Sequence, residues 1–84
     1  ALDQNYPNPF NPMTTIAFTV PRDGRVSLKV YDMRGRMVRE LVNETRAAGR
    51  HEVTFDGTGL ASGMYMYQVT SGDFTDTRRM TLVK

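Results

Sequence analysis

The chain has 84 residues with 11 basic and 9 acidic side chains, which give a formal net charge of +2. This length is that of one small domain, and so small and evenly mixed a charge excludes an extended nucleic-acid-binding surface. The chain has no cysteine, so its apolar core must hold the fold without disulfides or thiolate-bound metals. No apolar run approaches the ~20 residues that a membrane-spanning helix needs, so no membrane insertion is expected.

The chain opens with a proline-rich segment, residues 1–12, which contains three of the four prolines. Proline fixes φ and removes a backbone donor, so neither a helix nor a central strand is expected here. We predict an extended arm that leads into the folded body. Tyr6 and Phe10 are expected to pin this arm in place, because a solvated linker seldom carries two aromatic residues.

After the arm, apolar and polar residues alternate with period two, which is typical of half-buried β-strands. Strands are predicted over residues 14–20 and 25–31, with a turn at 21–24 between them. Their inward residues are predicted to be Ile16, Phe18 and Val20 in the first strand and Val26, Leu28 and Val30 in the second.

Residues 32–35 form a predicted hairpin turn, and its glycine can adopt a positive φ. A third strand is predicted to return over residues 36–42. Its apolar residues Val38 and Leu41 are out of phase, which a β-bulge or burial on both faces would explain. Residues 43–49 are polar and are predicted to be a loop.

Three further strands are predicted over residues 50–56, 64–71 and 74–84. A glycine-rich loop over 56–63 and a tight turn at 72–73 separate them. Their inward residues are predicted to be His51, Val53 and Phe55, then Tyr65, Tyr67 and Val69, and finally Met80 and Leu82.

Six short strands and an extended arm, with turns at regular intervals, predict an all-β fold: an immunoglobulin-like antiparallel β-sandwich of about seven strands. We expect it to be a single module that spans residues 1–84. The strongest competing helix, residues 32–48, has leucines and valines too sparse to form an apolar stripe.

Residues that could carry chemistry are few. His51 is the only histidine and shares a face with Val53 and Phe55, so we expect it at the edge of the core. Without cysteine or a second histidine, neither a nucleophile–base pair nor a zinc site can form. Asp56 lacks the second carboxylate that calcium normally needs. We therefore expect no cofactor, no metal and no catalytic activity.

The fifth strand is apolar on both faces, since Met64 and Met66 alternate with the tyrosines. It could be a central strand that the arm covers, or the methionines could form a surface that docks against a parent or transport protein. The edge of the last strand offers a second contact by strand addition. There Arg78, Arg79 and Lys84 would discourage indiscriminate pairing.

Several motifs follow one another along nearly the whole chain. They are NYPNPFNP at 5–12, TIAF at 15–18, VYDMRGR at 30–36, AGRHEV at 48–53, LASGMYMY at 60–67 and TRRMTLVK at 77–84. In this order they resemble the type A C-terminal sorting domain of type IX secretion system substrates. Any one of these motifs alone would be weak, but their order and coverage make the resemblance strong.

The resemblance implies a non-catalytic sorting module of a larger protein that reaches the cell surface or medium through the periplasm. It implies recognition by the outer-membrane translocon and, in many cases, removal by a sortase-like peptidase. We expect the module to be a monomer that follows upstream domains of a parent protein. The residues on which the family's turn and terminal motifs fall, and which we expect to act in translocon recognition, are Gly63, Tyr65, Tyr67, Arg78, Arg79, Met80, Leu82, Val83 and Lys84.

Two other functions stay open at this point. One is a passive structural module, because the immunoglobulin-like domain of flagellar hook-capping proteins has a similar opening and hairpin pattern. The other is a glycan-binding accessory module. Sugar stacking is disfavoured because the chain has no tryptophan and most of its tyrosine and phenylalanine residues are expected to point inward.

Overall fold

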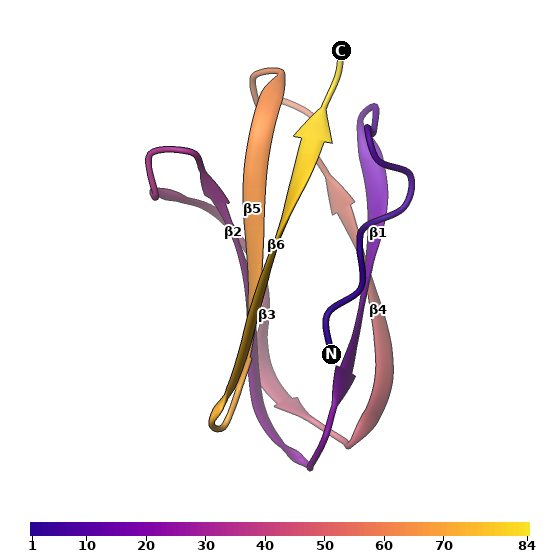
Figure 1. Ribbon diagram of the computed structural model, residues 1–84, viewed down its shortest axis with the longest axis vertical. Coiled ribbons are helices and arrows are strands. Elements are labelled where there is room, and N and C mark those ends of the chain that lie inside the picture. The colour runs from indigo at the N-terminus through magenta and orange to yellow at the C-terminus, as the bar shows by residue number, and fades with distance from the viewer.

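Two antiparallel β-sheets pack face to face in the computed structural model, which describes residues 1–84 (Figure 1). One sheet has the strand order β1-β4 and the other has the order β3-β2-β5-β6. The strands are β1 (Met13–Val20), β2 (Gly24–Asp32), β3 (Met37–Arg46), β4 (Gly49–Asp56), β5 (Gly63–Ser71) and β6 (Phe74–Leu82). Two hairpins, β2–β3 and β5–β6, lie within the larger sheet, and the other three connections cross between the sheets. The predicted immunoglobulin-like sandwich is confirmed, with six strands in place of about seven.

The core lies between the two sheets and follows the predicted alternation of side chains. Every strand residue predicted to point inward is buried or half-buried, and the side chains of β1, β2 and β5 supply most of the core. Between residues 1–12 and β4, the rings of Phe10 and Phe55 meet edge to face with their centroids 5.8 Å apart. No helix of the length and hydropathy needed to cross a membrane is present.

The irregular phase of β3 comes from two bulges. The register with β2 shifts at two places, and the residues passed over on β3 are Val38 and Leu41, which the sequence had shown to be out of phase. The loop predicted over 43–49 is wrong for most of its length, because β3 stays paired with β2 as far as Arg46. The reason is that β3 is an edge strand whose outer side chains are exposed to solvent, so its polar composition resembles that of a loop.

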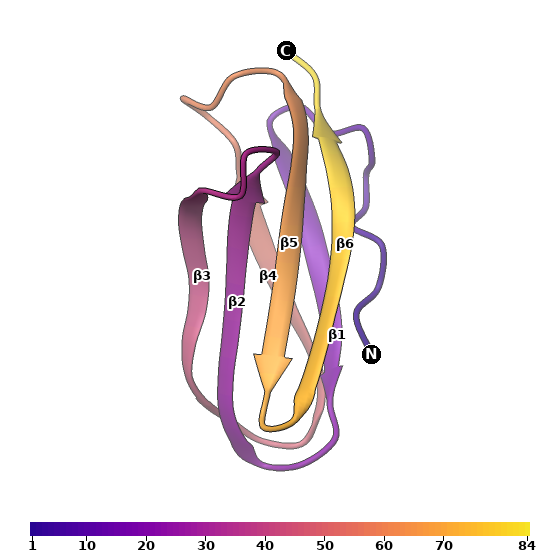
Figure 2. The same cartoon turned by 60° about the vertical axis from the view of Figure 1, so that its left-hand side comes forward.

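Residues 1–12 take the place of a seventh strand without forming one. Isolated bridges join Leu2 and Tyr6 to β1 in antiparallel fashion and Phe10 to β6 in parallel. The arm therefore crosses from one sheet to the other and closes one side of the sandwich, beside β1 and β6 (Figure 2). The opposite side, where β3 and β4 end their sheets, stays open.

The prediction that Phe10 pins the arm is confirmed, since its side chain is only 1% exposed. The prediction for Tyr6 is wrong, because its side chain is 81% exposed. In an extended backbone adjacent side chains point to opposite sides, and here Asn5 takes the inward position. Leu2 supplies the second apolar anchor instead, also buried in the core.

β5 is a central strand, as one of the two interpretations required, but the arm does not cover its methionines. The arm packs on the inner side, where it contacts the hydroxyl of Tyr67. Met64 and Met66 lie on the opposite face, and Met64 is 44% exposed. The expectation that the arm hides these methionines is therefore wrong.

These positions make Phe10 and Tyr6 a matched pair for mutation. Phe10→Ala should lower the free energy of unfolding by about 3–5 kcal/mol, as expected for a large aromatic side chain removed from a core. Tyr6→Ala should change it by no more than about 0.5 kcal/mol, because the side chain is exposed and the backbone bonds to Thr15 remain. Urea denaturation of both variants measures the difference, and equal losses would contradict the assigned arm position.

Candidate functional site

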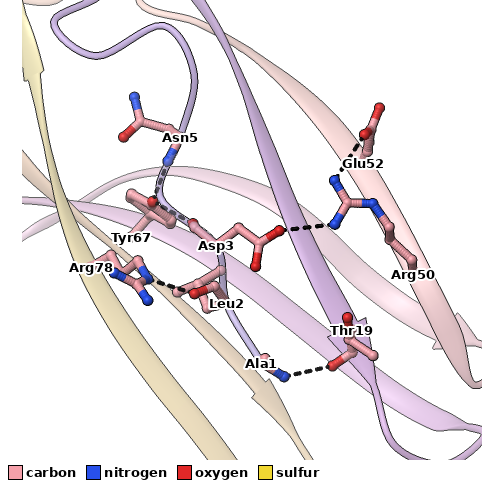
Figure 3. A network of polar contacts seen from close by, with 9 residues as sticks. All are labelled: Ala1, Leu2, Asp3, Asn5, Thr19, Arg50, Glu52, Tyr67 and Arg78. Carbon is pink, nitrogen blue, oxygen red and sulfur yellow. Dashed lines mark hydrogen bonds and ion pairs between the residues drawn. The ribbon is translucent and has the colours of Figure 1, made fainter.

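The hydroxyl group of Tyr67 ties the arm to the larger sheet (Figure 3). It donates a hydrogen bond to the carbonyl oxygen of Asp3 and accepts one from the backbone N–H of Asn5, each at 2.8 Å. Both partners are backbone groups, so a single side chain fixes the path of the arm over three residues. Burial raises the pKa of Tyr67 above the ordinary value of 10.0, which keeps the phenol protonated and able to donate.

Beyond this point the arm pairs with the edge of β6. The backbone N–H of Phe10 donates to the carbonyl of Thr81 at 2.9 Å, and the N–H of Val83 donates to the carbonyl of Phe10 at 3.0 Å. The side chain of Asn8 accepts from the N–H of Thr81, and that of Gln4 donates to the carbonyl of Arg79. The edge that the sequence left available for strand addition is therefore occupied by the arm along its last residues.

The same arm pairs with β1 on its other side. The N–H groups of Asp3 and Tyr6 donate to backbone carbonyls of β1, at 2.9 Å and 3.0 Å. The carboxylate of Asp3 also forms an ion pair with Arg50, at 2.9 Å (Figure 3). Because both side chains of this pair are about half exposed, the pair contributes little, and the backbone bonds dominate.

A small polar cluster fixes the corner of the arm. The buried side chain of Asn5 donates to the hydroxyl of Thr14 at 3.0 Å, and that hydroxyl donates to the carbonyl of Pro7 at 2.9 Å. No buried side-chain nitrogen or oxygen lacks a partner. Sequence reasoning missed the roles of Leu2 and Asn5. Only for Leu2 was a signal present, as the one large apolar residue of the first five.

The nine residues expected to act in translocon recognition fall into two groups by exposure. The buried group consists of Tyr65, Tyr67, Met80 and Leu82. The exposed group consists of Gly63, Arg78, Arg79, Val83 and Lys84. The structure brings both groups together on the paired strands β5 and β6. In the folded module only the exposed group is accessible to a partner, and the buried group forms part of the core.

The members of these motifs also differ in what they contact. The Nε–H of Arg78 donates to the carbonyl of Leu2 and so helps to hold the arm, whereas Arg79 lies on the outer face opposite Met66. The hydroxyl of Tyr65 donates to the carbonyl of Ala61 at 2.6 Å, which fixes the loop before β5. Gly63 begins that strand with a φ of 146°, a conformation that favours glycine.

The residues weighed for catalysis or metal binding have structural partners. His51 is half-buried, stacks on Phe18 with ring centroids 5.5 Å apart, and places Nε2 2.7 Å from the carbonyl oxygen of Ala47. Asp56 accepts hydrogen bonds from the hydroxyl and the N–H of Thr58, which lower the pKa of its carboxyl group. No cluster of three or more potential metal-ligating side chains is present.

One pocket, of about 470 Å³, is lined by residues of the β1–β2 and β5–β6 turns. Both turns lie at the end of the sandwich opposite the C-terminus (Figure 1). It is lined almost entirely by polar and turn residues. The carboxylate of Asp23, one of its lining residues, already accepts the N–H of Ala48 at 2.7 Å. None of the residues expected to act in recognition borders this pocket.

Fold and site together define a small immunoglobulin-like module in which an N-terminal arm and a C-terminal strand are bound to each other. The chain belongs to the family described as secretion system C-terminal sorting domain, whose family model matches residues 4–83. The resemblance to type IX sorting domains predicted from the motifs is thereby confirmed. The module is a sorting signal for cargo of this secretion system, whose sorting domains mark proteins for export to the cell surface or medium.

A solved structure shows the same fold. The chain is similar to a part of PorZ, described as an essential bacterial surface component of the type IX secretion system of Porphyromonas gingivalis. The TM-score is 0.72 and the identity 23%, over 100% of this chain and 12% of that one. A second similar structure is the Ig1 domain of mouse SynCAM 2, with a TM-score of 0.46 and 12% identity over 86% of this chain and 81% of that one. No match was found among curated proteins.

The role of the Tyr67 hydroxyl can be tested with Tyr67→Phe, which keeps the ring in the core. The variant should lose about 1–3 kcal/mol of unfolding free energy, because two backbone groups of the arm lose their partner in a buried site. Chemical denaturation gives the loss, and limited proteolysis should show faster cleavage within residues 1–12. An unchanged stability would mean that the hydroxyl does not hold the arm.

The raised pKa of Tyr67 predicts a dependence of stability on alkaline pH. Its contribution is fully present below pH 10, the ordinary value for the unfolded chain, and is lost as the pH rises through the raised value of the folded state. The wild type should therefore lose unfolding free energy above about pH 10. Tyr67→Phe should show a smaller decline when both proteins are titrated in denaturant at several pH values. Identical profiles would contradict the buried, protonated phenol.

Proposed function

We propose that the chain acts as a non-catalytic sorting module. After delivery through the periplasm, the outer-membrane translocon recognises it in its folded state. One observation carries this proposal: in the terminal motif buried and exposed residues alternate. Met80 and Leu82 help build the core, whereas Arg79 and Val83 face outward from the same strand and its extension. The outward residues are therefore displayed correctly only once the sandwich has folded.

Removal by a sortase-like peptidase, where it occurs, would act on chain that precedes the arm. Proteolytic cleavage generally requires an exposed and mobile backbone. Residues 2–10 are instead held by hydrogen bonds to β1 and β6, and two of their side chains are in the core. We therefore propose that the arm, whose residue Ala1 already accepts a hydrogen bond from the N–H of Thr19, forms the fixed boundary of the module, and that the accessible junction lies before the arm.

The module is proposed to work as a monomer. An exposed flat edge strand favours pairing between copies, and such edges are protected in different ways on the two sides of this sandwich. On one side the arm occupies β6 and β1. On the other side β3 is bent by its two bulges, and both β3 and β4 carry exposed charged side chains.

A reporter fusion tests the sorting role. A periplasmic reporter carrying residues 1–84 at its C-terminus should appear outside cells that have the type IX machinery and stay in the periplasm of cells that lack it. Deletion of Thr77–Lys84 removes β6 and should abolish export. Cell fractionation with immunoblotting measures both outcomes. Retention of the intact fusion in the periplasm of competent cells would refute the sorting role, and unchanged export after the deletion would refute the part assigned to the terminal motif.

A further inference from the structure

The exposed apolar side chains of the module gather at one end. The large hydrophobic residues that stay exposed are Tyr6, Met13, Met33, Met37, Met64 and Val83. All except Tyr6 lie at the end of the sandwich that also holds the β2–β3 turn, the start of β5 and the C-terminus (Figure 1). Four of the six methionines therefore stay at least 44% exposed at this end of the folded module.

The larger sheet carries Met37 and Met64, and its β2–β3 turn carries Met33. Tyr31 of β2 lies opposite Met37 of β3 on one side and Met66 of β5 on the other, and Met66 in turn lies opposite Arg79 of β6. Residues directly opposite each other in antiparallel strands point to the same face. This row therefore crosses all four strands on the outer face. We call Tyr31, Met33, Met37, Met64 and Met66 the methionine surface.

Some charged side chains around the methionine surface form ion pairs or hydrogen bonds, and others form no ion pair. Arg34 on the β2–β3 turn, Arg79 beside Met66, and Lys84 at the C-terminus form no ion pair. The nearby carboxylate of Asp32 is already engaged, since it accepts from Arg36 Nε and from two backbone N–H groups of the turn. The methionine surface thus has several free cations at its margin. One carboxylate without an ion pair, that of Glu40, also lies on this face, opposite Lys29.

We propose that the methionine surface is the docking surface of the module. Its partner is a protein of the secretion machinery that presents apolar side chains surrounded by aspartate and glutamate. This inference rests on the proposed function. The free cations at the margin of the methionine surface would attract these carboxylates and speed association. Methionine side chains are flexible and polarisable, so they can adapt to an apolar partner surface.

Two other regions of the molecule are closed to a partner. The inner faces of both sheets form the core, and the arm occupies the edges of β1 and β6. The outer face is also where Arg79, an exposed member of the terminal motif, lies beside the methionines. Docking there would explain how this motif is read without unfolding the strand that carries it.

Two other occupants fit the surface less well. A second copy of the chain would bring free cations against free cations, which repel each other. A lipid surface is favoured by tryptophan and by a strongly basic face. This chain has no tryptophan and a net charge of only +2.

The test uses the reporter fusion with two acidic substitutions on the methionine surface, Met37→Glu together with Met64→Glu. Both side chains are about half exposed, so the fold should survive, which circular dichroism and a thermal melt will check. The exported fraction should fall at least about tenfold, as expected when two central apolar contacts are lost. Met37→Leu with Met64→Leu keeps the surface apolar and should be exported as well as the wild type. Tyr6→Glu, a matched change at an exposed residue on the arm, should also leave export unchanged.

A photoreactive phenylalanine analogue in place of Met66 should crosslink in living cells to a machinery protein, and the crosslink should disappear when Met37→Glu is added. The same analogue in place of Tyr6 should not give this crosslink. Two further measurements address the other occupants: sedimentation of the purified module for self-association, and binding to vesicles of anionic phospholipid.

The outcomes separate the two proposals. If the wild-type fusion is not exported, the proposed function fails. If it is exported and the double glutamate variant is folded and exported equally well, the sorting role stands and the methionine surface is refuted as its docking site. A dimer or vesicle binding that depends on Met37 and Met64 would likewise overturn the assignment to a machinery protein.

Discussion

The docking of residues 1–12 between the two sheets is the contact on which the rest of the structure depends. β1 and β6 would otherwise end their sheets with unpaired backbone groups, and the core between them would open to water on that side. Leu2 and Phe10 fill this gap, and two of the 15 core residues therefore come from the arm. The Tyr67 hydroxyl holds the arm at the level of Asp3 and Asn5. In a small chain that has no disulfide, this closure adds apolar burial that the two sheets alone lack.

This closure joins the two ends of the chain into one unit. The arm provides partners for the backbone of Thr81 and Val83, so the residues of the terminal motif are ordered by residues from the start of the chain. Under the proposed function, the sorting signal is a folded surface and differs from a linear peptide that a receptor binds in extended form. The same closure leaves the outer face of the larger sheet as the accessible face next to the terminal motif.

Much of the sandwich could be predicted because the alternation of apolar and polar residues along a strand indicates directly which side chains are buried. This holds for the inward side chains of β1, β2 and β5, and the alternation in β6 likewise predicted that Met80 and Leu82 are buried. The out-of-phase pair in β3 correctly indicated bulges. The predictions failed where local pattern and tertiary context differ. Residues 43–46 look like a loop because an edge strand meets water on its outer face, and Tyr6 looks like an anchor because aromatic character alone does not say which way it points.

The pairing of the arm with β6 had no local signal at all, since it joins Phe10 to Leu82 from opposite ends of the chain. The register of such a contact is set by the assembled sandwich and not by any short segment. For the same reason the sequence could indicate that Met64 and Met66 are unusual but not which face of the sheet the arm covers. Motif order along the chain identified the family, and the structure separated the motif residues that form the core from those that stay accessible.

Hydrogen exchange of the backbone amides tests the central claim most directly. The amides of Asp3, Tyr6 and Phe10 donate from the arm to β1 and β6, and the amide of Val83 donates to the arm. If the arm completes the sandwich, these four amides should exchange as slowly as those in the middle of β2 and β5, through global unfolding. If these amides instead exchange rapidly while β2 and β5 remain protected, the arm is only loosely attached, and the account of a closed sandwich with an ordered terminal motif is contradicted.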